Sequence, residues 1–272
     1  MVPPLLGPCG AKARRRPSQR GKATDTMTAH RWCSAALLAG VLAPSFAQAG
    51  PPYVTDDPEP VEYRHWEFYL ATQDAIVRRG ASGTAPHIEV NYGAMENLQI
   101  HAIAPLAYAR PSGGPIAYGP GDVELGAKLR FIQEGDYRPM VGIFPMFELP
   151  IGDESKGLGT GHLHVFIPLW FQKSFGDWTT YGGGGYWVNA GTTNRNYWYL
   201  GWQAQRRLSA LITLGGEVFY TTADQINGRS NVSFNIGFVI DLTEHHHILC
   251  SAGRSIVGDN LFQGYLAYQV TL

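Results

Sequence analysis

The strongest constraint on the fold of this chain is an alternation of apolar and polar residues that recurs from residue 63 to the C-terminus. In the segment 120–132, for example, Leu125 and Leu129 alternate with Glu124 and Lys128. Side chains of a β-strand point alternately to its two faces, so a period of two predicts a strand with one apolar and one polar face. We therefore expect an all-β protein whose strands separate two different environments.

Twelve segments with this pattern follow one another along the chain. They cover residues 63–73, 86–94, 97–107, 120–132, 137–149, 162–173, 177–188, 196–206, 209–221, 230–242, 246–254 and 262–272. Longer polar or glycine-rich stretches, such as 150–161, follow the odd-numbered segments, and tight turns, such as 174–177, follow the even-numbered ones. Short turns at one end and long loops at the other are typical of outer-membrane barrels. The pattern predicts a single transmembrane antiparallel β-barrel of about twelve strands with both termini on the periplasmic side.

Several residue types refine this expectation. The apolar face would contact outer-membrane lipid, because only a closed sheet leaves no unpaired backbone edge in a membrane. Aromatic residues near the strand ends suit the two interfacial girdles; they are Trp66, Trp170, Phe171, Trp178, Trp187, Tyr197, Trp198 and Trp202. Pro139, Pro145 and Pro168 fall within proposed strands, where each implies a bulge or a misplaced boundary. The run Gly182–Gly185 would either bend its strand or let something in the lumen approach the wall closely.

Composition excludes several other classes of protein. A formal net charge of −1 provides no basic field for nucleic acid, so no nucleic-acid partner is expected. The apolar content of 44% is too high for a disordered chain. No apolar run of about 18 residues occurs beyond the N-terminal region, so membrane-spanning helices are not expected.

The first part of the chain has a different composition from the rest. Residues 27–49 have the layout of a secretory signal peptide, and the basic stretch 1–26 most simply means that translation starts at Met27. Removing residues 1–49 takes seven of the 21 basic residues and one of the 22 acidic ones, which leaves 14 and 21. The remaining chain would be acidic, with Cys250 as its single cysteine and thus without an internal disulfide. We expect the barrel itself to cover residues 63–272, with the barrel assembly machinery as a partner.

The segment 50–62 is acidic and rich in proline, so it should form neither a strand nor a helix. It could enter the lumen as a plug or gate and pair with Lys128, Arg130 or Arg207. The alternative is a solvated periplasmic lead-in, which we favour from the sequence because terminal segments are usually mobile.

The polar faces of the strands supply the candidate pore-lining residues. These are Glu67, Glu89, His101, Glu124, Lys128, Arg130, Arg138, Glu148, Gln203, Arg207, Glu217 and Asp241. Such mixed charge would line a narrow channel and set its selectivity. It would equally form a salt-bridged polar core that fills the barrel, because buried charges need partners in either case.

No catalytic or metal site is expected. The nearest approach to a metal cluster is His245–His247, which would lie in a periplasmic turn, whereas His162 and His164 would lie near the outer rim. A structural zinc site needs about four convergent ligands. None of the nine histidines is followed by serine at the second position, and no GxSxG or GxGxxG motif indicates nucleophilic or dinucleotide chemistry. We predict neither cofactor nor enzymatic activity; a barrel enzyme acting on lipid is kept as an alternative, as is a closed structural barrel.

Six stretches of the chain carry a resemblance to a known family. They are YVTDDPEPVEYRHWEFYL, IEVNYGAMENLQIHAIAPL, GDVELGAKLRF, FELPIGDESKGLGTG, WFQKSFGDWTTYGGGGY and AGRSIVGDNLFQGYLAYQ, of which GDVELGAKLRF and the YGGGGY part of the fifth are the most specific. They resemble the bacterial MetA-pathway of phenol degradation family of outer-membrane transporters, and the likeness extends over nearly all of the chain after residue 50. The resemblance implies an outer-membrane barrel and, as permeants, small aromatic or hydrophobic molecules.

Overall fold

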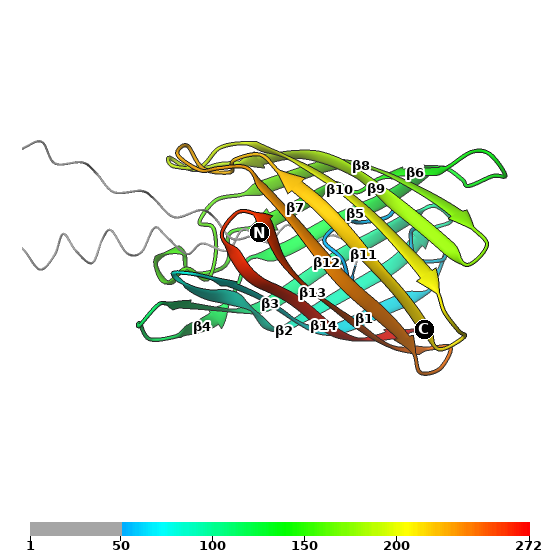
Figure 1. Ribbon diagram of the computed structural model, residues 1–272, viewed down its shortest axis with the longest axis horizontal. Coiled ribbons are helices and arrows are strands. Elements are labelled where there is room, and N and C mark those ends of the chain that lie inside the picture. Colours follow the sequence, from blue (N-terminus) through cyan, green and yellow to red (C-terminus); the bar gives the residue numbers. More distant parts are fainter. Residues whose placement is uncertain (1–50) are drawn as a thin grey trace, which may run out of the picture.

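The computed structural model describes residues 51–272, which form a barrel of tilted antiparallel strands (Figure 1). The strands are β1 (Trp66–Val77), β2 (Gly80–Met95), β3 (Leu98–Pro111), β4 (Ala117–Pro120), β5 (Val123–Ile132), β6 (Met140–Ile143), β7 (Met146–Leu149), β8 (His164–Phe175), β9 (Trp178–Asn189), β10 (Tyr197–Arg207), β11 (Ile212–Thr221), β12 (Asn231–Asp241), β13 (His246–Val257) and β14 (Asn260–Thr271). A short 3-10 helix, η2 (Glu154–Lys156), lies between β7 and β8. The predicted extension 1–26 and signal peptide 27–49 lie outside the described residues.

The barrel is closed by pairing of its first and last strands, with β1 and β14 in register from Glu67 and Thr271 onward. β4 and β5 both pair with β3, so together they form one interrupted strand. β6 and β7 both pair with β5 on one side and with β8 on the other, so they form a second interrupted strand. Twelve antiparallel strands therefore surround the lumen, as the sequence predicts. Trp66 and Leu272 exchange two backbone hydrogen bonds of 2.8 Å, which places the start of β1 and the C-terminus at the same end.

Proline explains one of the two interruptions. Pro145 separates β6 from β7, because it has no N–H to donate to a ladder. Pro168 lies within β8, opposite Gly185 of β9. Pro139 precedes β6, so the expected boundary at residue 137 is wrong.

The connections differ in length between the two ends of the barrel. One end carries the loops 112–116, 150–163, 190–196 and 222–230, and the other carries the connections 96–97, 133–139, 176–177, 208–211 and 242–245. Two of the expected long loops are instead tight turns, at 78–79 and 258–259. The reason is that the hairpins β1–β2 and β13–β14 extend further than the alternation suggests, for example through Val77 paired with Gly80.

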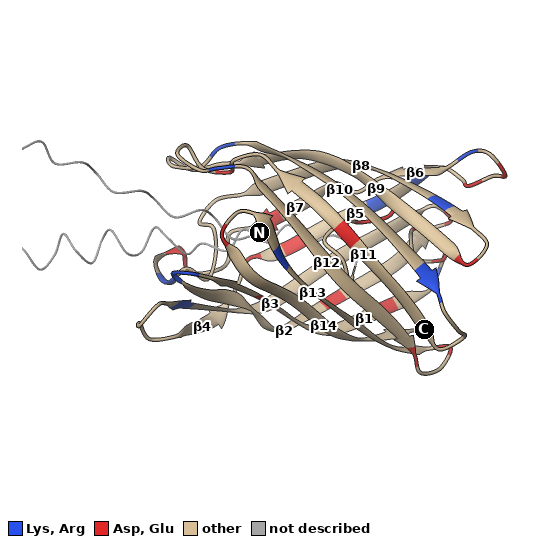
Figure 2. Cartoon of the chain, viewed as in Figure 1, with Lys and Arg blue, Asp and Glu red and all other residues tan. Residues whose placement is uncertain are grey.

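The two faces of the wall differ as expected. On β5, Leu125, Leu129 and Phe131 are exposed on the outside, whereas Glu124 and Lys128 are buried inside. In Figure 2, short charged stretches lie on several strands that are otherwise tan, and further charged residues lie in the connections at both ends of the barrel. No helix within residues 51–272 has the length and apolar character needed to cross a membrane.

Some aromatic residues face the lumen instead of the interfacial girdles. Trp170, Trp187 and Tyr197 are buried and pack with Phe166 and Tyr199 in an aromatic cluster on the inner face of β8–β10. The rings of Phe166 and Trp187 stack with centroids 4.6 Å apart. The prediction of a girdle position is therefore wrong for these three residues. It failed because neighbouring residues on a strand face opposite sides, so Trp170 and Phe171 cannot both point outward.

Candidate functional site

The residues before β1 run inside the barrel. We call residues 51–62 the lumen segment. Thr55 and Asp56 are completely buried, and the hydroxyl of Tyr53 donates a 2.9 Å hydrogen bond to the carbonyl of Gly237 on β12. Ser251 on β13 donates to the carbonyl of Pro52. The favoured expectation of a solvated lead-in is wrong, because this segment has buried partners on the barrel wall.

Glu217 on β11 binds the backbone of the lumen segment. Its two carboxylate oxygens accept hydrogen bonds from the N–H groups of Val54 at 2.8 Å and Thr55 at 2.7 Å. Asn235 on β12 donates a third hydrogen bond, of 2.6 Å, to the same carboxylate. Hydrogen bonds to an ionised carboxylate are stronger than neutral ones. This one side chain therefore satisfies two backbone donors that have no strand partner.

Lys128 on β5 holds the next part of the segment. Its ammonium nitrogen lies 2.9 Å from Asp56 Oδ1 and 3.4 Å from Asp57 Oδ1. The same nitrogen lies 5.1 Å from the ring centre of Phe144, within the range of a cation–π contact. Further along the segment, Gln99 on β3 accepts a 2.9 Å hydrogen bond from the N–H of Val61. The segment is thus attached to opposite parts of the wall.

Glycines on β10, β11 and β12 make room for the segment. A Cβ on Gly201 would overlap Oγ1 of Thr55, and a Cβ on Gly215 would lie 2.6 Å from the hydroxyl oxygen of Tyr53. A Cβ on Gly237 would lie 3.0 Å from a ring carbon of Tyr53. In contrast, Cβ atoms on Gly182–Gly185 would meet neighbouring strands. Close approach to the wall therefore occurs, but at glycines that the sequence did not single out.

Seven of the predicted pore-lining residues are buried on the inner side of the wall: Glu89, His101, Glu124, Lys128, Glu148, Gln203 and Glu217. Glu67 is half-buried and accepts a 2.7 Å hydrogen bond from the hydroxyl of Tyr69. Four other predicted residues lie near the end of the barrel that carries the C-terminus. They are Arg130, Arg138, Arg207 and Asp241.

Two of these four residues contact other polar side chains, and the other two are exposed. Arg130 donates to Asn97 at 3.1 Å, and Asp241 contacts His247 at 2.7 Å. Arg138 and Arg207 are exposed. Of the three cations proposed as partners for the lumen segment, Lys128 is the one that binds it.

A connected row of polar side chains crosses the inner wall. His101 on β3 contacts Asn91 Oδ1 at 2.6 Å through Nδ1 and Glu124 Oε1 at 2.9 Å through Nε2. Asn91 donates its amide to Glu89 at 2.9 Å, so its oxygen accepts from His101. His101 Nδ1 must then carry a proton, and Nε2 and Glu124 share another. Glu124 lies directly opposite Glu148 on β7.

The row continues beyond β7, where Glu148 Oε2 lies 3.2 Å from Nδ1 of His164 on β8. The sequence analysis did not include Asn91, and it considered His164 as a metal ligand but not as a pore-lining residue. Their positions on the polar faces of their strands could have identified both. Within residues 51–272 no group of three or more His, Cys, Asp or Glu side chains is arranged to hold a metal ion.

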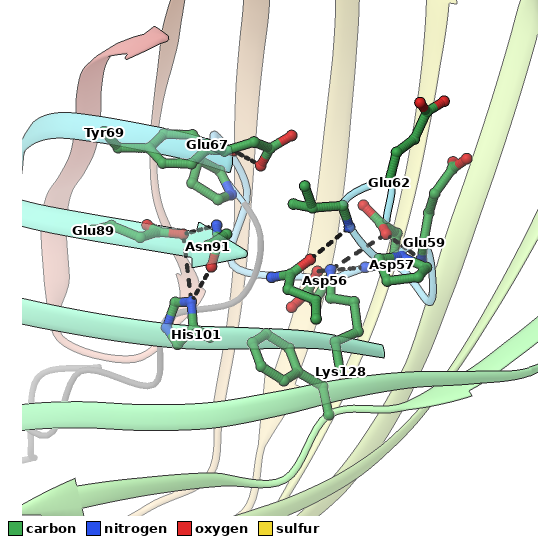
Figure 3. Close-up of a pocket in the computed structure, with 15 residues that line it drawn as sticks. Asp56, Asp57, Glu59, Glu62, Glu67, Tyr69, Glu89, Asn91, His101 and Lys128 are labelled. Atoms are coloured by element: carbon green, nitrogen blue, oxygen red, sulfur yellow. Dashed lines mark hydrogen bonds and ion pairs between the residues drawn. The ribbon is translucent and has the colours of Figure 1, made fainter. Parts of the chain in front are cut away.

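A cavity of about 340 Å³ remains between the lumen segment and the wall formed by β1, β2, β3 and β5. Figure 3 shows Glu67, Glu89 and His101 on its wall side and Asp57, Glu59 and Glu62 on its segment side. The lumen is therefore filled in part by the segment and in part left open beside it.

Comparison with solved structures identifies the fold. The crystal structure of the COG4313 outer membrane channel from Pseudomonas putida F1 is similar to this chain with a TM-score of 0.68 and 13% identity, covering 83% of this chain and 100% of that one. The KdgM porin in complex with disordered oligogalacturonate has a TM-score of 0.51 and 9% identity, and the NanC porin 0.52 and 8%; each match covers 76% of this chain and 98% of the other.

Sequence comparison gives no match: no protein-family model and no curated protein matches the chain. The structural neighbours named above are outer-membrane channels and porins. A closed barrel with an apolar outer face is also the architecture that an outer membrane requires of a spanning sheet. The chain therefore has the porin-like fold of an outer-membrane β-barrel, and its location is the bacterial outer membrane.

Proposed function

We propose that this protein is a narrow diffusion channel for small solutes, with the lumen segment as its constriction. The observation that carries the proposal is the cavity of about 340 Å³ beside the segment, lined by polar and charged side chains. A barrel that served only as a structural element would gain stability by filling this volume, because close packing is favourable. Twelve strands also enclose a lumen intermediate between a packed eight-stranded barrel and an open porin.

The lumen segment would set the size limit of the channel. Its contacts with Glu217 and Lys128 fix it across the lumen. Solutes would then pass between the segment and the inner faces of β1, β2, β3 and β5. Movement of the segment away from these two residues would open a wider path, so the same segment would act as a gate.

The resemblance to the phenol degradation family supports a finer proposal, in which the permeants are aromatic. The aromatic cluster on β8–β10 is the feature that favours it. Val54 of the lumen segment packs against this cluster. The cluster would therefore offer its rings to a permeant after the segment has moved, since contacts between aromatic rings are favourable.

Liposome swelling tests the proposal. Liposomes that contain the purified full chain should swell in small sugars and amino acids more slowly than liposomes that contain a chain lacking residues 51–62. For aromatic permeants, uptake of phenylalanine into liposomes should rise more than uptake of alanine when the segment is deleted, because the two amino acids carry the same charges and differ in the ring. Equal rates with protein-free liposomes for every solute and both chains would contradict the channel. Uptake of phenylalanine and of alanine rising by the same factor would contradict the aromatic preference alone.

A further inference from the structure

We propose that the cavity beside the lumen segment is a binding site for a small organic cation that carries a primary ammonium group, and that it makes the channel selective for cations. This inference rests on the proposed channel function and names the class of its preferred solute. It is carried by the balance of charge in the cavity and by buried carboxylate oxygens that have no partner.

Negative charge dominates the cavity. Its lining includes six carboxylates: Asp56, Asp57, Glu59, Glu62, Glu67 and Glu89. Two lining side chains can be cationic, Lys128 and His101. Lys128 is already engaged by the two aspartates of the lumen segment. The carboxylates of the wall, Glu67 and Glu89, are left without a lysine or arginine partner among the residues that line the cavity.

The unpartnered oxygens indicate where a ligand would bind. Glu89 is 2% exposed; its Oε1 accepts from Asn91, and its Oε2 has no hydrogen-bond partner within residues 51–272. Asp56 is completely buried, and its Oδ2 likewise has no partner in the described part of the chain. A buried acceptor without a donor is unfavourable, so a donor that enters the cavity removes this penalty.

Hydrogen bonding already present on the wall orients these carboxylates. Tyr69 donates to Glu67 Oε2 at 2.7 Å, and Gln269 on β14 donates to the hydroxyl of Tyr69 at 2.8 Å. His101 Nδ1 lies 3.6 Å from Glu89 Oε1, next to the Asn91 contact. The wall side of the cavity is therefore built from hydrogen-bonded side chains on β1, β2 and β3 (Figure 3).

The geometry favours an ammonium group over a metal ion or an anion. The described residues provide no cluster of three or more His, Cys, Asp or Glu side chains convergent enough for a metal. An ammonium group carries three N–H donors and a full positive charge, so it can bind separate carboxylates at once. An anion would meet the six carboxylates of the lining and would be repelled.

Two measurements on the reconstituted full chain test the site. In planar bilayers under a KCl gradient, the reversal potential gives the permeability ratio of K⁺ to Cl⁻, which should exceed one. In liposomes, glucosamine should enter faster than glucose, and glucose faster than glucuronate, because these sugars share a ring and differ in charge. Glu89→Gln and Glu67→Gln should each lower the cation preference, by up to about tenfold for the loss of one contact between charged groups.

Matched variants distinguish a failure of the cation site from a failure of the channel itself. Glu89→Asp keeps the charge and should retain the preference, and Glu244→Gln removes a charge from an exposed turn outside the cavity and should change nothing. Heat-dependent mobility on gels reports whether each barrel is folded. Equal permeability to K⁺ and Cl⁻ in the folded wild type, or unchanged ratios in both glutamine variants, would overturn the cation site and leave the channel standing. The absence of any current and uptake would overturn the channel as well.

Discussion

Lys128 on β5 places its ammonium nitrogen 2.9 Å from Oδ1 of Asp56, and both side chains are buried inside the barrel. The two residues are 72 positions apart in the chain. The ion pair joins the wall to the residues that precede the first strand, so it links the structure of the barrel to the width of its lumen.

Lys128→Met should release the lumen segment. Removing one partner of a buried ion pair costs about 3–5 kcal/mol, because the other charge stays buried without compensation. Accessibility can be followed through Val54→Cys in a Cys250→Ser background, where it is the one thiol within residues 51–272. Labelling by a water-soluble maleimide should become at least about a hundredfold faster.

Lys156→Met provides the control for this change. Lys156 forms an ion pair of 2.7 Å with Asp153, but both side chains are exposed in the loop between β7 and β8. Exposed pairs contribute little, so its effect on labelling should be negligible. Equal labelling of the Lys128 and Lys156 variants would show that the buried pair does not hold the segment.

Glu217→Gln should also loosen the segment, but less. The amide keeps one oxygen acceptor and loses the negative charge that receives the N–H groups of Val54 and Thr55. Hydrogen bonds to charged groups contribute about 1.5–3 kcal/mol, so labelling should rise roughly tenfold or more. Because Val54→Cys retains its backbone N–H, the same thiol reports the change. A labelling rate identical to that of the parent chain would contradict the role of Glu217.

Gly201→Ala should displace the segment by steric overlap. The added Cβ would overlap Thr55 Oγ1 and would lie 2.6 Å from the hydroxyl oxygen of Tyr199. The free energy of unfolding should fall by about 1–3 kcal/mol, as it does at other overpacked sites. In a chain lacking residues 51–62 the loss should be smaller, since Thr55 is then gone.

Gly135→Ala is the control, because its Cβ would approach nothing closer than 3.8 Å. The same loss of stability for Gly201→Ala with and without the segment would show that Thr55 is not the obstacle.

Asp224 should make the loop 222–230, between β11 and β12, sensitive to pH. Burial raises the pKa of Asp224 to about 6, from an ordinary value of 3.8 for an aspartate side chain. Because the pKa is higher in the folded loop, the protonated form stabilises it. That contribution is complete below about pH 3.8 and is lost as the pH rises through about 6, to a total on the order of 2–3 kcal/mol.

Hydrogen exchange of the loop amides measures this effect. After correction for intrinsic rates, protection should fall between about pH 4 and pH 7 in the parent chain. Asp224→Asn should remove the pH dependence and retain the protection at neutral pH. Constant protection of the loop over this range in the parent chain would contradict the predicted link between the ionisation of Asp224 and the stability of the loop.

Alternation along the strands is a local property, and it predicted much of the wall. It placed Glu124 and Lys128 inside and Leu125 outside, and the structure confirms all three. The expectation for Trp170 was wrong because it followed from the position of an aromatic residue near a strand end. The alternation of faces along β8 instead places residue 170 on the inner side. Parity decides which environment a side chain meets, since a shift of one residue exchanges the two faces.

The position of the lumen segment could not be predicted in the same way. Its proline and acidic residues exclude regular structure but do not determine where the chain goes. Its partners Lys128 and Glu217 lie 72 and 162 residues away from Asp56 and Thr55, respectively. These contacts exist only once the barrel has closed, so no local pattern in residues 51–62 encodes them.

Single-channel conductance in planar bilayers tests the central claim most directly. The account predicts a small, steady conductance for the full chain and a clearly larger one after deletion of residues 51–62. Lys128→Met should fall between them, with transitions between the two levels as the segment leaves and returns. The absence of current from all three folded proteins would contradict the claim that this barrel is a channel constricted by its own N-terminal segment.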